Sequence, residues 1–149
     1  MSFSAADLAA IKAAVTADAT ALGYWTAGNP GQCCAYLNAP SPTPVLIWRP
    51  DIPVAELLTA VVWSAFVALT PQVQAAWAAL TAGGTVDSTN ANVRAGFVTV
   101  FGAGSQTVTN LAAIAQRPAS RLEAIFTAAG VSTQYGATAQ VADLIGAMA

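Results

Sequence analysis

Few residues in this sequence have side chains suited to acid, base or nucleophilic chemistry, and histidine is absent. Without an imidazole, the chain has no Ser-His-Asp triad and no histidine ligand for a metal. The acidic residues are scattered along the chain: Asp7, Asp18, Asp51, Glu56, Asp87, Glu123 and Asp143. No two of them are three or four positions apart within an expected helix, so no pair is predicted to share a face for general acid and base catalysis. We therefore expect no enzymatic activity.

The sulfur chemistry is confined to the adjacent pair Cys33 and Cys34. Neighbouring cysteines rarely bridge each other, because a disulfide requires two well-separated Cα atoms. Two sulfurs without a histidine or a second Cys-x-x-Cys pair do not make a zinc site. A hydrolase that used Cys34 or a serine as its nucleophile would lack an imidazole base. The pair is predicted to be two reduced, partly buried thiols, with no metal and no cofactor.

The glycines of the segment Gly102-Ala-Gly104-Ser105 raise the question of a nucleotide-binding loop. The segment lacks the third glycine of the dinucleotide fingerprint and the Gly-Lys-Ser/Thr of a phosphate loop, and it follows an expected helix rather than a strand. We interpret it as a helix end followed by an N-cap.

Basic residues are also few, with only five between Lys12 and Arg121. They form no basic patch of the kind that binds nucleic acid. Arg117 and Arg121 flank a helix start and are expected to form a solvated or partner-facing pair.

A proline-rich segment over residues 39–53 is the candidate interaction element, with an extended arm or short strand at 40–53. Prolines at alternate positions favour extended chain over helix. Within it, Val45-Leu46-Ile47-Trp48 is a strand candidate that either pairs with another chain or lies as an arm over the helices. Aromatic residues in irregular chain often anchor interfaces. The predicted intersubunit contacts are Val45, Leu46, Ile47, Trp48, Arg49 and Trp25, whereas Trp63 and Trp77, in apolar helices, are expected in the core.

The remaining sequence is punctuated as a series of helices. Ser4 with Asp7, and Ser120 with Glu123, form capping boxes, and Thr70-Pro71 gives an N-cap followed by proline. The expected helices cover 5–22, 32–38, 54–69 and 71–81, then a helix opened near Asn90, one opened by Ser105 and broken at Pro118, one opened by Ser120, and 139–148 opened by Thr138. The pattern predicts a mainly α fold, a compact antiparallel helical domain of about six helices that spans residues 1–149 as one domain.

Charged residues make up only 8 % of the chain and apolar residues 56 %, against about 25 % charged in typical domains. Disorder is excluded, because it requires low hydrophobicity and high net charge. The apolar run 57–69 is shorter than the roughly 20 residues that cross a bilayer, and no signal peptide is expected. We expect a soluble, intracellularly made protein without membrane contact. Either an alanine-rich genome or burial of charge-poor faces around the proline-rich segment against other subunits explains the composition.

Several motifs occur in an order that carries a resemblance. They are Leu8-x-x-Ile-Lys12, Leu22-Gly23-Tyr24, Tyr36-Leu37-Asn38-Ala39-Pro40, Val86-Asp87, Phe101-Gly-Ala-Gly-Ser105-x-Thr107, Arg117-Pro-Ala-Ser120-Arg121-x-Glu123 and the terminal helix opened by Thr138. Together they resemble a family of small proteins encoded among the virion genes of tailed bacteriophages. The Trp48 segment and the Cys33-Cys34 pair depart from the family's pattern. The resemblance implies a structural part of the particle without catalysis.

The leading hypothesis is therefore a non-enzymatic virion component in the neck (head–tail connector) or tail region, made in the host bacterial cytoplasm. Its expected partners are other phage structural proteins and copies of itself. A capsid cement or decoration protein is the alternative in the same class. From a different class, a helical binding module would recognise a host protein or peptide through a groove between its helices.

Overall fold

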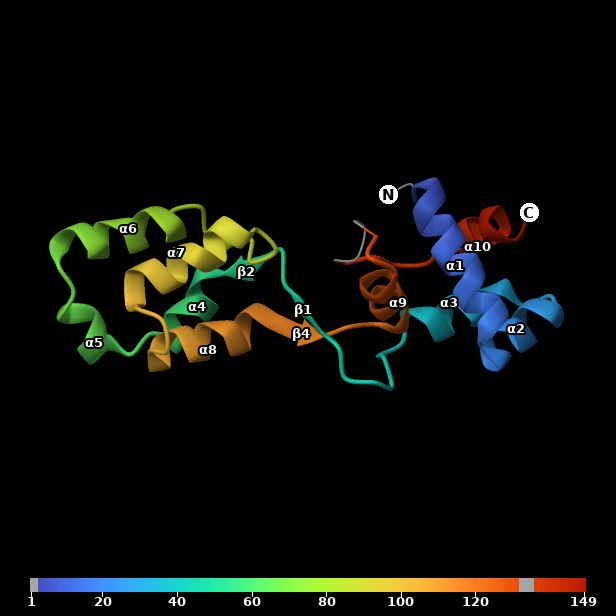
Figure 1. Cartoon of the computed structure of the whole chain (residues 1–149), viewed down its shortest axis with the longest axis horizontal. Helices are drawn as coiled ribbons and strands as arrows, with labels where there is room; N and C mark the ends of the chain where they lie inside the picture. The colour runs from blue at the N-terminus through green and yellow to red at the C-terminus, as the bar shows by residue number, and fades with distance from the viewer. Residues whose placement is uncertain (1–2, 132–135) are drawn as a thin grey trace. The chain divides into compact units, whose positions relative to one another are not determined.

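The computed structural model describes residues 3–131 and 136–149 and is mainly helical, which confirms the expected fold class (Figure 1). The described residues form ten helices, rather than about six, and four short strands. The helices are α1 (Ala5–Ala17), α2 (Ala19–Thr26), α3 (Pro30–Asn38), α4 (Val54–Ala60), α5 (Trp63–Val67), α6 (Pro71–Thr81), α7 (Ala91–Phe101), α8 (Gln106–Ala115), α9 (Arg121–Ala129) and α10 (Val141–Met148). The strands are β1 (Leu46–Trp48), β2 (Ile52–Pro53), β3 (Thr85–Val86) and β4 (Gln116–Pro118).

Contacts within the chain divide it into two compact units, where the sequence predicts one domain. Unit 1 comprises Met1–Leu46 and Pro118–Ala149, and unit 2 comprises Ile47–Arg117. Each unit has its own set of buried apolar residues. Neither crossing between the units carries the glycine- and serine-rich composition of a flexible linker, so the sequence gives no signal for this division.

Unit 1 is built around the apolar faces of the five helices α1, α2, α3, α9 and α10. α1 packs against α2, α9 and α10, while α3 packs against α2, α9 and α10. Ile11, Leu37, Phe126 and Leu144 are almost fully buried in its core. Phe3 packs edge-to-face on Phe126, with ring centroids 5.6 Å apart. Both predicted capping boxes, which start α1 and α9, are confirmed.

The helix expected over residues 5–22 is interrupted at Asp18, and this part of the prediction is wrong. The Asp18 N–H donates to the Ala14 carbonyl at the end of α1. Its carboxylate accepts from the backbone N–H groups of Thr20 and Ala21, both at 2.9 Å, and so caps α2. Aspartate competes for backbone N–H groups in this way, which favours a cap over a helix interior. α2 then continues past residue 22, the expected helix end, to Thr26.

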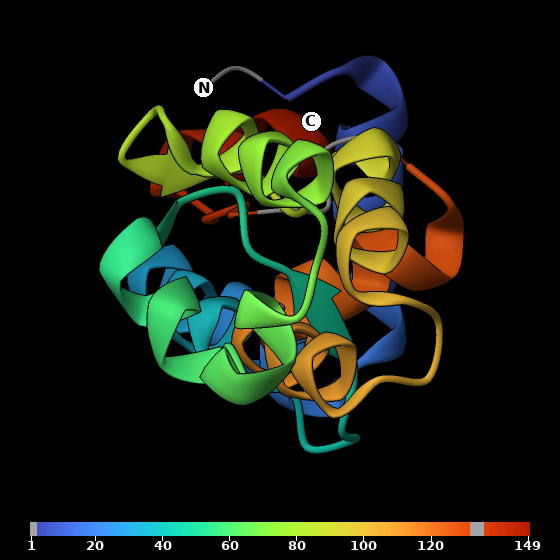
Figure 2. The same cartoon turned by 90° about the vertical axis from the view of Figure 1, so that its left-hand side faces the viewer.

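In unit 2, α7 packs on both α6 and α8, and α4 packs on α8 (Figure 2). The helix expected over residues 54–69 is divided into α4 and α5 at Val61 and Val62. The Val62 N–H donates to the hydroxyl of buried Thr107 at 3.1 Å, and the Asn110 side chain donates to the Ala60 carbonyl at 3.1 Å. Two side chains of α8 thus satisfy backbone groups that a continuous helix would have paired.

The short strands pair within the chain. β1 confirms a strand at the predicted place, but it pairs with β4 of the same chain, so no second chain is needed to complete it. The sequence pattern predicts a helix from Ser105 to the break at Pro118, so the β4 segment was expected to be the end of that helix. β2 and β3 are antiparallel, with Ile52 opposite Val86 and Pro53 opposite Thr85.

The last helix begins at Val141 rather than at residue 139. The Asp143 carboxylate accepts from the Gln140 N–H at 2.9 Å, which makes Gln140 the N-cap in place of Thr138. None of the described helices combines the length and apolar character needed to span a membrane.

Candidate functional site

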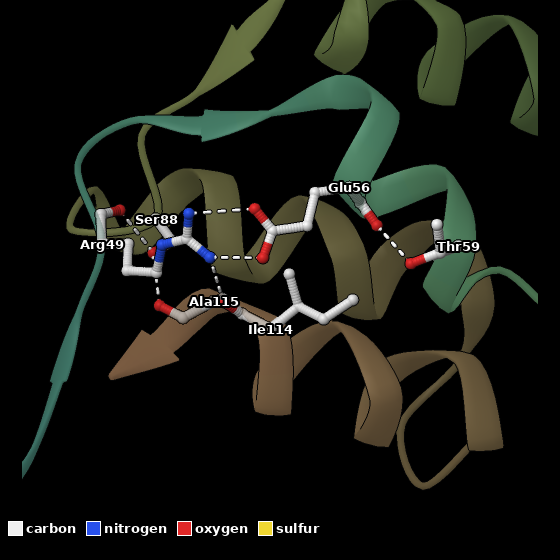
Figure 3. A network of polar contacts seen from close by, with 6 residues as sticks. All are labelled: Arg49, Glu56, Thr59, Ser88, Ile114 and Ala115. Carbon is white, nitrogen blue, oxygen red and sulfur yellow. Dashed lines mark hydrogen bonds and ion pairs between the residues drawn. The ribbon is translucent and has the colours of Figure 1, made fainter. Parts of the chain in front are cut away.

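A network of polar contacts joins several segments of unit 2 (Figure 3). The Arg49 guanidinium donates to both carboxylate oxygens of Glu56, at 2.5 and 2.9 Å, and to the Ile114 carbonyl at 3.1 Å. The hydrogen bond from Arg49 lowers the pKa of Glu56, and the same bond raises the pKa of Arg49. A bidentate pair of this kind fixes geometry. It also leaves the carboxylate of Glu56 engaged rather than available as a base.

Ser88 belongs to the same network and is fully buried. Its hydroxyl is 2.7 Å from the Arg49 carbonyl oxygen and 3.0 Å from that of Ala115. The Ser88 N–H donates to the Arg49 carbonyl, and the Arg49 N–H donates to the Ala115 carbonyl. Carbonyl groups do not remove a proton from a hydroxyl, so this arrangement holds three segments together rather than activating a nucleophile.

Replacing Ser88 with alanine is expected to lower the free energy of unfolding by about 1 kcal/mol, the net value of a buried hydrogen bond. The loss stays moderate because backbone N–H groups still reach both carbonyls. Chemical denaturation measures the difference. Ser64, exposed on α5, provides the matched control: Ser64→Ala should change stability by less than about 0.5 kcal/mol. Equal effects of the two substitutions would contradict the role given to Ser88.

Trp48, predicted as an interface anchor, packs against the core of unit 2. The Arg94 guanidinium lies 4.7 Å from the centroid of its ring, a cation–π contact. Arg94 also donates to the carbonyls of Ser88 and Thr89, at 2.6 and 2.7 Å. One face of the Trp48 ring is therefore covered by the chain itself.

The other predicted interface residues differ in exposure. Leu46 has the most exposed side chain, at 60 %, whereas Ile47 is buried. Val45 and Arg49 are half-buried, and Trp25 is half-buried against the core of unit 1. Their role as intersubunit contacts stays a prediction, for which Leu46 is the best placed.

A different apolar surface, which the sequence did not predict, lies on α5. Trp63 is 51 % exposed and Val67 is 70 % exposed. The prediction that Trp63 is a core residue is therefore wrong, while Trp77 is buried as predicted. The break at Val61 and Val62 explains the error, because it changes the face on which the following apolar residues lie.

Unit 1 contains a groove of about 300 Å³ between α1, α3, α9 and the 41–45 segment, which we name the Tyr36 groove. Its lining residues are Ala14, Asp18, Tyr36, Leu37, Ser41, Pro42, Thr43, Val45, Arg121, Ala124, Ile125 and Ala128. The Tyr36 hydroxyl donates to Asp18 Oδ2 at 3.2 Å. The Arg121 guanidinium stacks 4.1 Å from the centroid of the Tyr36 ring and donates to the Tyr36 carbonyl at 3.1 Å. Arg121, predicted as one of a solvated or partner-facing pair, thus forms part of a groove wall.

The backbone N–H of Ala21 is the main cause of a lowered pKa at Asp18, with smaller contributions from Tyr36, Thr20 and Arg121. A carboxyl whose folded pKa is lowered stabilises the fold above its ordinary value of 3.8, and this stabilisation is lost as the pH falls through the lower folded value.

Stability should therefore decrease below about pH 4, and Asp18→Asn should make that decrease less steep. Asparagine keeps the N-cap, since it is as good a cap as aspartate, but it cannot ionise. Denaturation midpoints measured between about pH 6 and pH 2.5 test this expectation. An unchanged slope in the variant would show that Asp18 does not contribute.

Other candidate sites have structural roles. Cys33 and Cys34 are free, buried thiols, and burial raises the pKa of both. Gly102 ends α7 with φ 83°, and Ser105 caps α8 by accepting from the Val108 N–H at 3.2 Å, as predicted. Within residues 3–131 and 136–149, no cluster of three or more histidine, cysteine or carboxylate side chains is placed to hold a metal ion.

Comparison with known proteins adds no assignment to this geometry: no protein-family model, no curated protein and no solved structure matches the chain. Among the described residues, the exposed apolar side chains of α5, the exposed Leu46 and the Tyr36 groove are the features that we consider for a function. Exposed apolar side chains and a groove of this size are features typical of binding surfaces.

Proposed function

We propose that this chain is a non-enzymatic structural component of a tailed bacteriophage particle, in the neck or tail region, that works by packing against copies of itself and other phage structural proteins. The observation that carries the packing role is an uncharged stretch that exposes large apolar side chains. No charged residue occurs between Glu56 and Asp87, and within this stretch α5 exposes Trp63 and Val67. The phage assignment rests on the resemblance of the capping and turn motifs.

The exposed residues of α5, namely Trp63, Ser64, Ala65 and Val67, form what we call the α5 surface. Removing apolar surface from water is favourable by about 25 cal/mol per Å². Interface cores are enriched in aromatic residues and depleted of charge. An uncharged surface also suits contact between identical copies, because no like charges meet across a two-fold axis.

The chemistry of the polar residues supports a non-catalytic role. The Glu56 carboxylate is held by Arg49, the Ser88 hydroxyl lies against carbonyl groups, and the two thiols are buried. Each of these groups stabilises the chain's own structure.

Mass spectrometry of purified particles tests the proposal. We expect the chain to be present at a constant ratio to the other virion proteins, and its absence from particles would overturn the phage assignment. The copy number separates the two structural alternatives. A copy number equal to that of one ring of subunits indicates the neck or tail. A copy number that matches the capsid lattice indicates a cement protein.

The Tyr36 groove favours a second candidate, a helical module that binds a peptide of another protein. Its position between helices agrees with such a role. Detection of the chain bound to a host protein, and not in particles, would favour this candidate over the structural one.

A further inference from the structure

The Tyr36 groove has the dimensions and lining of a ligand site. Its volume of about 300 Å³ lies at the lower limit for small-molecule and peptide sites, about 300–1,000 Å³. Aliphatic side chains, among them Leu37, Val45 and Ile125, form much of the wall. Two oppositely charged side chains, Asp18 and Arg121, line the same space.

Arg121 has donor capacity that the described part of the chain does not use. A guanidinium carries five N–H donors. One hydrogen bond, from Nη1 to the Tyr36 carbonyl, is made to the described residues, and Nε is buried without an acceptor among them. Buried donors without an acceptor are uncommon in proteins. Because Nε is buried, the donors for a ligand are the other N–H groups of Nη1 and Nη2, which make no hydrogen bond to the described residues.

Asp18 offers the complementary acceptor. A carboxylate has about four lone-pair sites, and the described residues occupy three of them: Oδ1 accepts from two backbone N–H groups and Oδ2 from the Tyr36 hydroxyl. One lone pair of Oδ2 is not used by the described residues and can accept a hydrogen bond from a ligand. The groove therefore presents one donor group and one acceptor group in an aliphatic setting.

The charges of the lining define the ligand. The charges of Asp18 and Arg121 cancel, so a ligand with a net charge would lose hydration in this aliphatic setting without a net electrostatic gain. A peptide backbone carries a carbonyl acceptor and an N–H donor and has no net charge. We propose that the Tyr36 groove binds an uncharged, aliphatic peptide segment of another protein, with a peptide carbonyl on Arg121 and a peptide N–H on Asp18. This inference rests on the second candidate function, peptide binding in the Tyr36 groove, and is independent of the phage assignment.

One wall of the groove is fixed before any ligand arrives. The Ser41 N–H donates to the Ala119 carbonyl, the Ala119 N–H to the Val45 carbonyl and the Arg121 N–H to the Ala39 carbonyl, each at 2.9 Å. The proline at position 42 restricts the wall further. A preformed wall reduces the ordering cost of binding.

Chemical-shift titration of the full chain with three blocked tripeptides tests the proposal. The probes are acetyl-Ala-Leu-Ala-amide and its analogues with glutamate or lysine in place of leucine. We expect the leucine peptide to shift amide resonances of the groove residues with a Kd of the order of 1 mM. Both charged analogues should bind about tenfold more weakly, because a charged side chain loses hydration among the aliphatic walls without a net electrostatic gain.

Two substitutions of exposed alanines provide a matched pair. Ala128 lines the groove and is exposed, so Ala128→Phe fills the space without altering the core. Ala113 is exposed on α8, in unit 2. Ala128→Phe should abolish the shifts and Ala113→Phe should retain them, while the spectra of both variants stay dispersed.

Three results would overturn the inference. The first is that the amide resonances of the groove residues do not shift with about 10 mM of the leucine peptide. The second is that the three peptides bind equally well, or that the two variants bind the leucine peptide equally well. The third is a set of the same shifts that depends on protein concentration without any peptide, since it would assign the groove to a second copy of this chain.

Discussion

Val67→Lys is expected to weaken self-association of the chain by more than tenfold while leaving its fold unchanged. Val67 is 70 % exposed, so a lysine there remains solvated in the isolated subunit and should change stability by less than about 0.5 kcal/mol. In an assembled state, the same ammonium group would be buried without a partner. Such a charge costs several kcal/mol, and about 1.4 kcal/mol already corresponds to a tenfold change in affinity.

Sedimentation equilibrium over a range of protein concentrations measures this effect, and incorporation into particles gives a second readout. Val141→Lys is the matched control, because Val141 is an exposed valine on α10, in unit 1. We expect the control to assemble as the unsubstituted chain does. If both variants assemble normally, the α5 surface is not the contact between copies.

Phe126→Ala is expected to lower the free energy of unfolding by about 3–5 kcal/mol, and Leu111→Ala by about 2–5 kcal/mol. Both side chains are fully buried, Phe126 in unit 1 and Leu111 in unit 2. The two cores share no residue. Each substitution should therefore increase amide exchange mainly in its own unit, since local unfolding follows cooperative units of structure.

Hydrogen exchange followed by mass spectrometry resolves this difference. For Phe126→Ala, we expect faster exchange in α1, α3, α9 and α10 and retained protection in α6, α7 and α8. Phe126→Leu keeps most of the buried volume and serves as the control, with an expected loss below about 1.5 kcal/mol. Equal loss of protection in both units would show that the chain unfolds as one cooperative body.

Local signals predicted much of the fold. The Asp7 N–H donates to the Ser4 hydroxyl and the Glu123 N–H to the Ser120 hydroxyl, so each of these bonds connects residues three positions apart. The start of α6 at Pro71 and the cap at Asn90 were predicted for the same reason. A cap is specified by the few residues that form it.

The break between α4 and α5 was not predicted, because side chains that are distant in the sequence stabilise it. The side chains of Thr107 and Asn110 form hydrogen bonds with backbone groups at the end of α4. The residues at the break itself, Val61 and Val62, are apolar like their neighbours and give no local signal for it. Asp18 had a local capping signal, but the apolar spacing of α1 and α2 continued across it. An uninterrupted periodicity is thus weak evidence for an uninterrupted helix.

The candidate sites were predictable to different degrees. The uncharged stretch between Glu56 and Asp87 is visible in the sequence, although the exposure of Trp63 and Val67 depends on the helix break. The Tyr36 groove combines residues from α3, α9 and the α1–α2 junction. No short-range pattern indicates that Asp18 and Arg121 line one space.

The insertion of unit 2 within the sequence of unit 1 has a consequence for synthesis on the ribosome. Residues 47–117 emerge as one continuous piece and can fold at once. The helices α1, α2 and α3 emerge earlier but must wait for α9 and α10, which complete their core. At about 5–20 residues per second, this delay lasts several seconds. During this delay, apolar side chains of α1, α2 and α3 stay exposed on the nascent chain. A chaperone can therefore bind these helices before α9 and α10 pack against them.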